Sequence, residues 1–119
     1  MAAKIQKVSA MDTTVLDALT VLRMATAEGA RALGMERIIG SLEKGKKADI
    51  IVLDTRKPHL TPMYNPYSHL VYAARAADVV HSVINGRLVM EDRVLLTMDV
   101  NEAMAKAREK SRDVLRWTA

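Results

Sequence analysis

Apolar residues recur at helical spacing through the first third of the chain. Residues 1–10 are predicted to be helical from their first turn, although no capping residue precedes them. After a break at 12–15, a second apolar stripe runs over Asp17–Leu33, with an aspartate that can cap its start. Gly34 stands where a left-handed C-terminal residue is favoured. Thr26 could equally cap a separate second helix, so the pattern is compatible with either one helix or two over this range.

The helical period then disappears, and the next apolar segment is typical of a strand. Ile50–Leu53 is apolar at four consecutive positions, between Asp49 and Asp54. A continuous apolar run of this length fits a strand covered on both faces better than an edge strand. We therefore expect neighbouring elements on both sides of it.

A β-hairpin is the strongest local prediction of the sequence. Asn85 and Gly86 lie between two apolar runs and suit the two positive backbone angles of a type I′ turn. Residues 79–84 and 87–91 are therefore predicted to pair. A two-residue loop would place these residues opposite one another: Val83 and Leu88, His81 and Met90, Ser82 and Val89, Val80 and Glu91.

Two further helices are predicted from capping signals. Asn65 can cap a short helix over 66–74, whose first residue is a proline that needs no N–H there. Asp99, followed three residues later by Glu102, resembles a capping box at the start of a last amphipathic helix. We expect that helix to dock through one apolar stripe, formed by Val100, Ala103, Met104, Ala107, Ser111, Val114 and Leu115.

Composition indicates one soluble globular domain. The chain has 119 residues, of which 50% are hydrophobic and 27% charged, and it has no cysteine, which excludes disulfides and thiolate sites. The net charge of +4 comes from interspersed signs with few aromatic residues, so we expect no nucleic-acid binding. No apolar stretch has the length of a signal peptide core or a membrane span, so we expect no membrane partner and a cytoplasmic location.

The three histidines form no metal-binding pattern. His59, His69 and His81 are widely spaced, without an HxH or HExxH arrangement. We expect His59 to bond to backbone in its irregular segment and His69 to tie down a loop at a helix start. His81 is expected to be a core or boundary residue of its strand.

Other polar groups give no stronger prediction of catalysis. Asp49 and Asp54 are five positions apart, so along a strand they point to opposite faces, and they are expected to accept hydrogen bonds at the strand ends. Ser41 and Ser82 have no neighbouring base to activate them. The segment Gly40–Lys46 has the spacing of a phosphate loop, but it lacks the following Ser or Thr and leads into a strand.

Four sequence motifs in combination resemble one enzyme family. "MATAEGARALGM", residues 24–35, followed by "GSLEKGKKADIIVLD", residues 40–54, is similar to the C-terminal signature of the amidohydrolase superfamily. "KPHLTPMYNPYSHLVYAA" and "VINGRLVMEDR" are similar to the branch of methylthioadenosine/S-adenosylhomocysteine deaminases and related chlorohydrolases. The resemblance covers nearly all of residues 2–116.

The resemblance implies an α+β fold cut from a larger enzyme. Residues 1–34 would be terminal helices of a (β/α)8 barrel, residues 35–98 part of a β-sandwich with the hairpin at 79–91, and residues 99–119 a C-terminal helix. The family's one divalent metal, usually zinc, is held by histidines and an aspartate upstream of this segment. We therefore assign no catalytic, cofactor-binding or metal residue to this chain.

Two functions follow from the resemblance. The first is a C-terminal fragment of a metal-dependent hydrolytic deaminase of adenosine-like substrates, inert alone and structural in role. The alternative is a stand-alone oligomerisation or interaction module derived from such an enzyme. In either case we expect Ile50–Leu53 and the hairpin to lack strand partners, so that unpaired edges and apolar faces would drive homo-oligomerisation.

Overall fold

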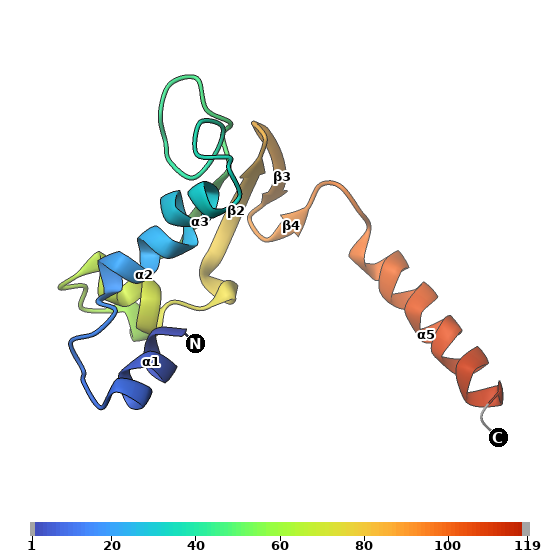
Figure 1. The fold of residues 1–119 in the computed structure, drawn as a ribbon. Helices are drawn as coiled ribbons and strands as arrows, with labels where there is room; N and C mark the ends of the chain where they lie inside the picture. The colour runs from blue at the N-terminus through green and yellow to red at the C-terminus, as the bar shows by residue number, and fades with distance from the viewer. Residues whose placement is uncertain (1, 118–119) are drawn as a thin grey trace.

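The computed structural model describes residues 2–117, and side chains as far as Val114, as an α+β arrangement of five α-helices and a four-stranded antiparallel sheet (Figure 1). This confirms the mixed α+β class predicted from the sequence. Residues 1, 118 and 119, which begin and end the predicted terminal segments, lie outside the described range.

The predicted N-terminal helices form, and the longer one is divided. Helix α1 spans Ala2–Ala10, α2 spans Ala18–Ala25 and α3 spans Ala27–Ala32. Asp17 caps α2, since its carboxylate accepts hydrogen bonds from the Thr20 N–H (3.1 Å) and hydroxyl (2.7 Å). At Thr26 the backbone leaves the helical region, and its hydroxyl donates to the Leu22 carbonyl (2.8 Å) instead of capping α3. Gly34 has a φ of +67°, as expected for a residue that ends a helix.

The sheet has the order β1-β2-β3-β4, with strands at Ile50–Leu53, Val79–Ile84, Arg87–Glu91 and Val94–Leu95. The hairpin of β2 and β3 is confirmed, with φ values of 51° and 77° at Asn85 and Gly86. The prediction that Ile50–Leu53 lacks a strand partner is wrong, because β1 pairs antiparallel with β2. Its opposite edge has no neighbouring strand among the described residues.

The predicted hairpin register is correct next to the turn and wrong farther from it. Val83 pairs with Leu88 as expected, but Met90 pairs with Ser82 instead of His81. One extra residue on β3, Val89, forms a bulge that shifts the next pair by one position. The turn residues fix only the nearest pairs, so the turn chemistry could not reveal this bulge.

Strand β1 is more exposed than its apolar sequence predicts. Ile51 and Val52 remain 59% and 44% exposed, so the expected cover on both faces is not present in the described part of the chain. An uninterrupted apolar run indicates that a strand suits burial. It does not identify the element that covers it.

Short helical turns connect β1 to β2. They are η1 (Pro58–Leu60), α4 (Pro66–Ser68), the π-helical turn η2 (His69–Ala73) and η3 (Ala76–Asp78). Asn65 caps α4 as predicted, accepting from the Ser68 N–H at 3.1 Å. The predicted helix over 66–74 therefore exists, but it is divided between an α-helical turn and a π-helical turn.

The last helix, α5 (Val100–Trp117), extends away from the rest of the molecule (Figure 1). Asp99 caps it, since its carboxylate accepts from the N–H groups of Asn101 and Glu102 at 2.8 and 3.0 Å. The expected docking of its stripe is not observed, because Val100, Met104 and Val114 remain 42%, 43% and 61% exposed. The stripe's last predicted member, Leu115, lies outside the described side chains.

The core of the described residues is small. Among the residues whose burial is described, 2–114, only Ala3, Ala30 and Leu60 are buried apolar residues, and Asp78 is the buried polar one. The radius of gyration is 18.9 Å, whereas a compact domain of this length would have about 13.5 Å. No helix in the described part of the chain is long and apolar enough to cross a membrane.

Candidate functional site

A pair formed by the half-buried His59 and the buried Asp78 is the most enclosed polar cluster in the described residues. The Nε2 atom of His59 lies 2.9 Å from Oδ2 of Asp78, which is only 3% exposed. The same oxygen accepts a hydrogen bond from the Arg75 N–H at 2.8 Å. The backbone carbonyl of Asp78 also accepts from the Asp54 N–H at 2.8 Å, which connects this cluster to the end of β1.

Local structure brings the two side chains together. His59 is the middle residue of η1, and Asp78 is the last residue of η3, just before β2 begins. The hydrogen bonds from His59 and from the Arg75 N–H lower the pKa of Asp78. The carboxylate is therefore ionised at neutral pH and accepts from both donors, which joins two turns that are 19 residues apart.

The sequence predicted the wrong hydrogen-bond partner for His59. A backbone bond was expected, but the ring binds the Asp78 carboxylate. Asp78 itself was not identified from the sequence. The available signal was the spacing of Arg75 and Asp78, three residues apart, which is the spacing of a helix-capping position and its partner.

The other two histidines have local partners. His69 Nδ1 lies 2.9 Å from the Asn65 carbonyl oxygen, which confirms that it ties down the start of a helix. His81 is partly exposed, accepts from the Asp92 N–H at 3.3 Å, and has its Nε2 atom 3.6 Å from the Asp92 carboxylate. The three rings therefore occupy separate places, as their spacing indicated.

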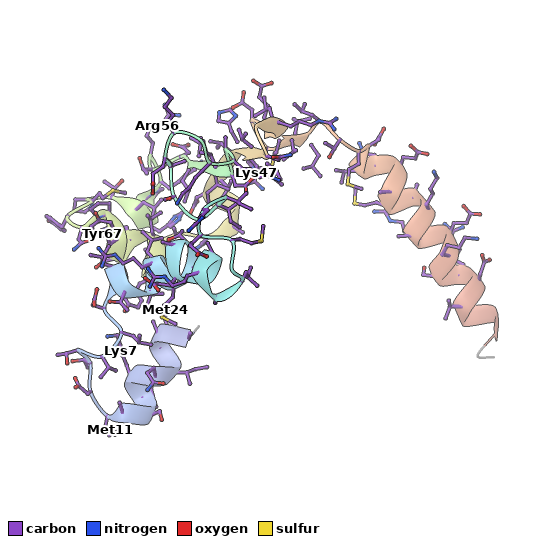
Figure 2. The ribbon with its side chains drawn as sticks, turned by 45° about the horizontal axis from the view of Figure 1, so that its top comes forward. Lys7, Met11, Met24, Lys47, Arg56 and Tyr67 are labelled. Carbon is purple, nitrogen blue, oxygen red and sulfur yellow. The ribbon has the colours of Figure 1, made fainter. Side chains whose placement is uncertain are left out.

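The two aspartates that bracket β1 accept hydrogen bonds at its ends, as predicted. Asp49 accepts from the Asn85 N–H at 2.6 Å, which ties the start of β1 to the hairpin turn. Asp54 accepts from the backbone and side chain of Arg56, both at 3.0 Å. These two bonds, with a further one from Lys57, lower the pKa of Asp54 to about 2. Figure 2 shows Arg56 at the outside of the molecule, so this pair is a surface contact.

The segment that resembles a phosphate loop is held by its own side chains. The Lys46 amine donates to the Ser41 hydroxyl at 2.6 Å, and that hydroxyl donates to Glu43 at 2.6 Å. Lys46 also lies 3.4 Å from Glu43, and these contacts lower the pKa of that glutamate. The amine is thus occupied by an internal carboxylate, which argues against a phosphate site here.

An open hollow of about 370 Å³ lies beside this segment, between α2, α3 and the loop that follows them. Its lining is mainly apolar, with Lys47 and Asp49 as its charged members. No group of three or more His, Cys, Asp or Glu side chains in residues 2–114 is arranged to hold a metal ion. The described residues therefore provide hydrogen-bonded pairs that stabilise turns, and they hold no group of three potential metal ligands. The sequence prediction that Ser41 has no neighbouring base is wrong, because its hydroxyl donates to the Glu43 carboxylate, although the same hydroxyl is also held by Lys46.

Comparisons with known proteins connect this arrangement to one family. Residues 1–89 match the sequence pattern of the "Amidohydrolase family". The 5-methylthioadenosine/S-adenosylhomocysteine deaminase of Syntrophobacter fumaroxidans is 62% identical over 112 residues, which are 94% of this chain and 26% of the relative.

Solved structures give the same result at the level of the fold. An adenosine deaminase from Xanthomonas campestris with bound zinc matches 97% of this chain and 26% of its own, with a TM-score of 0.90 and 42% identity. Atrazine chlorohydrolase from Arthrobacter aurescens, complexed with zinc, matches 79% of this chain and 20% of its own, with a TM-score of 0.71 and 26% identity. The chain thus spans about a quarter of the length of the relatives it matches.

Proposed function

This chain belongs to the amidohydrolase family, and on that premise we propose that it forms the C-terminal part of a metal-dependent deaminase of adenosine-like substrates. The observation that carries the proposal is the 62% identity, over 112 residues, to a methylthioadenosine/S-adenosylhomocysteine deaminase. In this proposal the chain has a structural role: α1 to α3 pack against a barrel, and the sheet is one part of a sandwich.

Catalytic inertness of the chain by itself is the second part of the proposal. The two solved relatives described above are zinc complexes. The residues described here do not fit such an ion, because no three potential ligands converge. His59, the histidine with the most buried partner, is already bonded to Asp78. We therefore derive no reaction step from this chain's own residues.

A stand-alone oligomerisation or interaction module is the alternative function. Its support is the exposure of large apolar side chains on several elements, such as Val8 at 72%, Leu33 at 72% and Ile51 at 59%. Where such side chains form a contiguous patch, the patch marks a site of association. They suit contact with the rest of an enzyme and contact between separate chains equally well.

A chimeric enzyme tests the first function. In the Syntrophobacter fumaroxidans deaminase, the matching 112-residue segment is replaced by the corresponding residues of this chain. We expect the chimera to bind zinc and to release ammonia from 5′-methylthioadenosine at a rate within about tenfold of the parent, because the exchanged segment touches no reacting atoms. A chimera that folds and binds zinc but does not deaminate the substrate would contradict the proposal.

The isolated chain supplies the control for inertness. With added zinc and the same substrate, it is expected to release no ammonia above a zinc blank. Turnover by the isolated chain would disprove inertness and leave the family assignment intact. The parent deaminase without the segment should also be inactive, which would show that the exchanged residues are needed for the active fold.

A further inference from the structure

We propose that Asn85 is a deamidation site, at which the Gly86 backbone nitrogen attacks the Asn85 side-chain amide, and that two hydrogen bonds from the start of β1 slow this reaction by holding the turn closed. The inference concerns the hairpin turn between β2 and β3, and it does not depend on the proposed deaminase function. The reaction is intramolecular and needs only water, so it requires no partner protein.

The sequence selects one asparagine of three. Only Asn85 is followed by glycine, whose nitrogen has no Cβ beside it and can approach the preceding amide carbon with the least hindrance. Asn65 is followed by a proline, whose nitrogen has no hydrogen to lose. Asn101 is followed by Glu102, whose N–H already donates to the Asp99 carboxylate at 3.0 Å. We therefore expect the reaction to occur first at Asn85.

The reaction exchanges one bond for another without oxidation or reduction. The Gly86 nitrogen gives its proton to hydroxide and forms a bond to Cγ of Asn85. The bond from Cγ to the side-chain nitrogen breaks, and ammonia leaves after taking a proton from water. Water then opens the resulting five-membered imide. Opening at the side-chain carbonyl gives aspartate, and opening at the backbone carbonyl gives isoaspartate, in which the main chain runs through the side chain.

The conformation of the turn opposes the attack. The φ angles of Asn85 and Gly86 are 51° and 77°, as in a type I′ turn. In such a turn the Gly86 nitrogen and the Asn85 Cβ lie on opposite sides of the Cα–C bond that joins the two residues, whereas the imide ring requires them on the same side. The turn must therefore open by rotation about this bond before the ring can close.

Two hydrogen bonds from the segment that leads into β1 resist this opening. The Gly86 N–H, which contains the attacking nitrogen, donates to the Ala48 carbonyl at 2.9 Å. The Asn85 N–H donates to Oδ1 of Asp49 at 2.6 Å. Loss of the Gly86 proton is also disfavoured while a carbonyl accepts that hydrogen bond. The turn should therefore react only when it separates from residues 48 and 49.

The products weaken the same contact. Both place a carboxylate at position 85, near the carboxylate of Asp49, so like charges repel. Isoaspartate also adds a main-chain atom to a two-residue turn, and the length of that turn fixes the pairing of β2 with β3. Deamidation is thus an irreversible change that loosens the attachment of β1 to the hairpin.

Peptide mass spectrometry after incubation at mildly alkaline pH tests the site. Samples are kept folded or in concentrated guanidinium chloride, and each asparagine is followed by the mass gained when an amide becomes an acid. We expect Asn85 to react before the other two in both samples, and at least about tenfold more slowly in the folded chain. Earlier reaction at Asn65 or Asn101, or no reaction at Asn85 in guanidinium chloride, would overturn the site. Equal rates in the two samples would overturn the protection.

Variants at position 49 test how the fold protects the turn. Asp49→Ala should react several-fold faster than the unmodified chain when folded, and at the same rate in guanidinium chloride. Asp49→Asn keeps an acceptor oxygen without the charge and should stay close to the unmodified rate. Asp54→Ala, at the other end of β1, is the matched control and should change neither rate. Circular dichroism checks that the variants remain folded.

Amide exchange of the unmodified chain needs no variant. The protection factor of the Gly86 N–H should match the slowing of deamidation by the fold, because both require the same opening. An unprotected Gly86 N–H would contradict the proposal. An unchanged rate in folded Asp49→Ala would also contradict it, and so would an equal acceleration in Asp49→Asn, which would assign the effect to charge.

Discussion

Replacing Leu60 with alanine should remove a large part of this chain's stability. Leu60 is 2% exposed and is the one large apolar side chain fully buried among the described residues. It is the last residue of η1, which lies against η2. Leu→Ala substitutions in cores destabilise by about 2–5 kcal/mol, depending on how far the neighbours close the cavity. Here few neighbours are fully buried, so partial closure is expected, and we predict a loss of about 2–3 kcal/mol.

Urea unfolding followed by far-ultraviolet circular dichroism measures this change. The matched control is Leu42→Ala, because Leu42 is 76% exposed. Surface substitutions of this kind change stability by about 0.5 kcal/mol or less. If Leu60→Ala lost no more stability than Leu42→Ala, the packing around η1 would not belong to the cooperatively folded part of the chain.

Four further substitutions test individual contacts. Asp78→Asn should lower the urea midpoint at pH 7. This difference from the unmodified chain should disappear as the pH falls through the lowered pKa of Asp78, because a carboxylate with a depressed pKa stabilises the fold only above that pKa. Urea midpoints of both proteins from pH 7 to 3 measure the change. Gly40→Ala should destabilise by about 3 kcal/mol in urea titrations, since φ is +92° and the added Cβ would lie 2.6 Å from that of Ala30. Gly45→Ala, with φ of +94° but open space, should lose only about 1 kcal/mol. Asp99→Ala should reduce helicity measured by circular dichroism, because removing an N-cap destabilises a helix by about 0.5–2 kcal/mol.

The features that could be predicted from the sequence are those encoded within a few neighbouring residues. Asp17, Asn65 and Asp99 each cap a helix as expected, because a capping side chain bonds to an N–H two or three positions ahead. The turn at Asn85 and Gly86 was predictable for the same reason, since both residues tolerate the positive φ that the turn requires.

The features that were missed depend on residues distant in sequence or on small irregularities. The bond between His59 and Asp78 joins two turns 19 residues apart, and no local pattern selects that partner. The bulge at Val89 adds one residue to a strand without a glycine or proline to mark it. The apolar stripe of α5 predicted docking that the described residues do not show, because a stripe does not specify its partner.

Local order and sparse burial coexist in this chain, and together they explain why its family membership is clearer than its activity. Caps, turns and paired strands define each element, yet three apolar residues are buried among the described ones, and the radius of gyration is 18.9 Å. Packing of apolar faces supplies most of the free energy that holds helices and sheets together. Ile51 and Val52 on β1 and Val100 and Met104 on α5 expose such faces. We therefore expect the stability of this chain to increase when those faces are covered by further protein, such as the remainder of a longer enzyme.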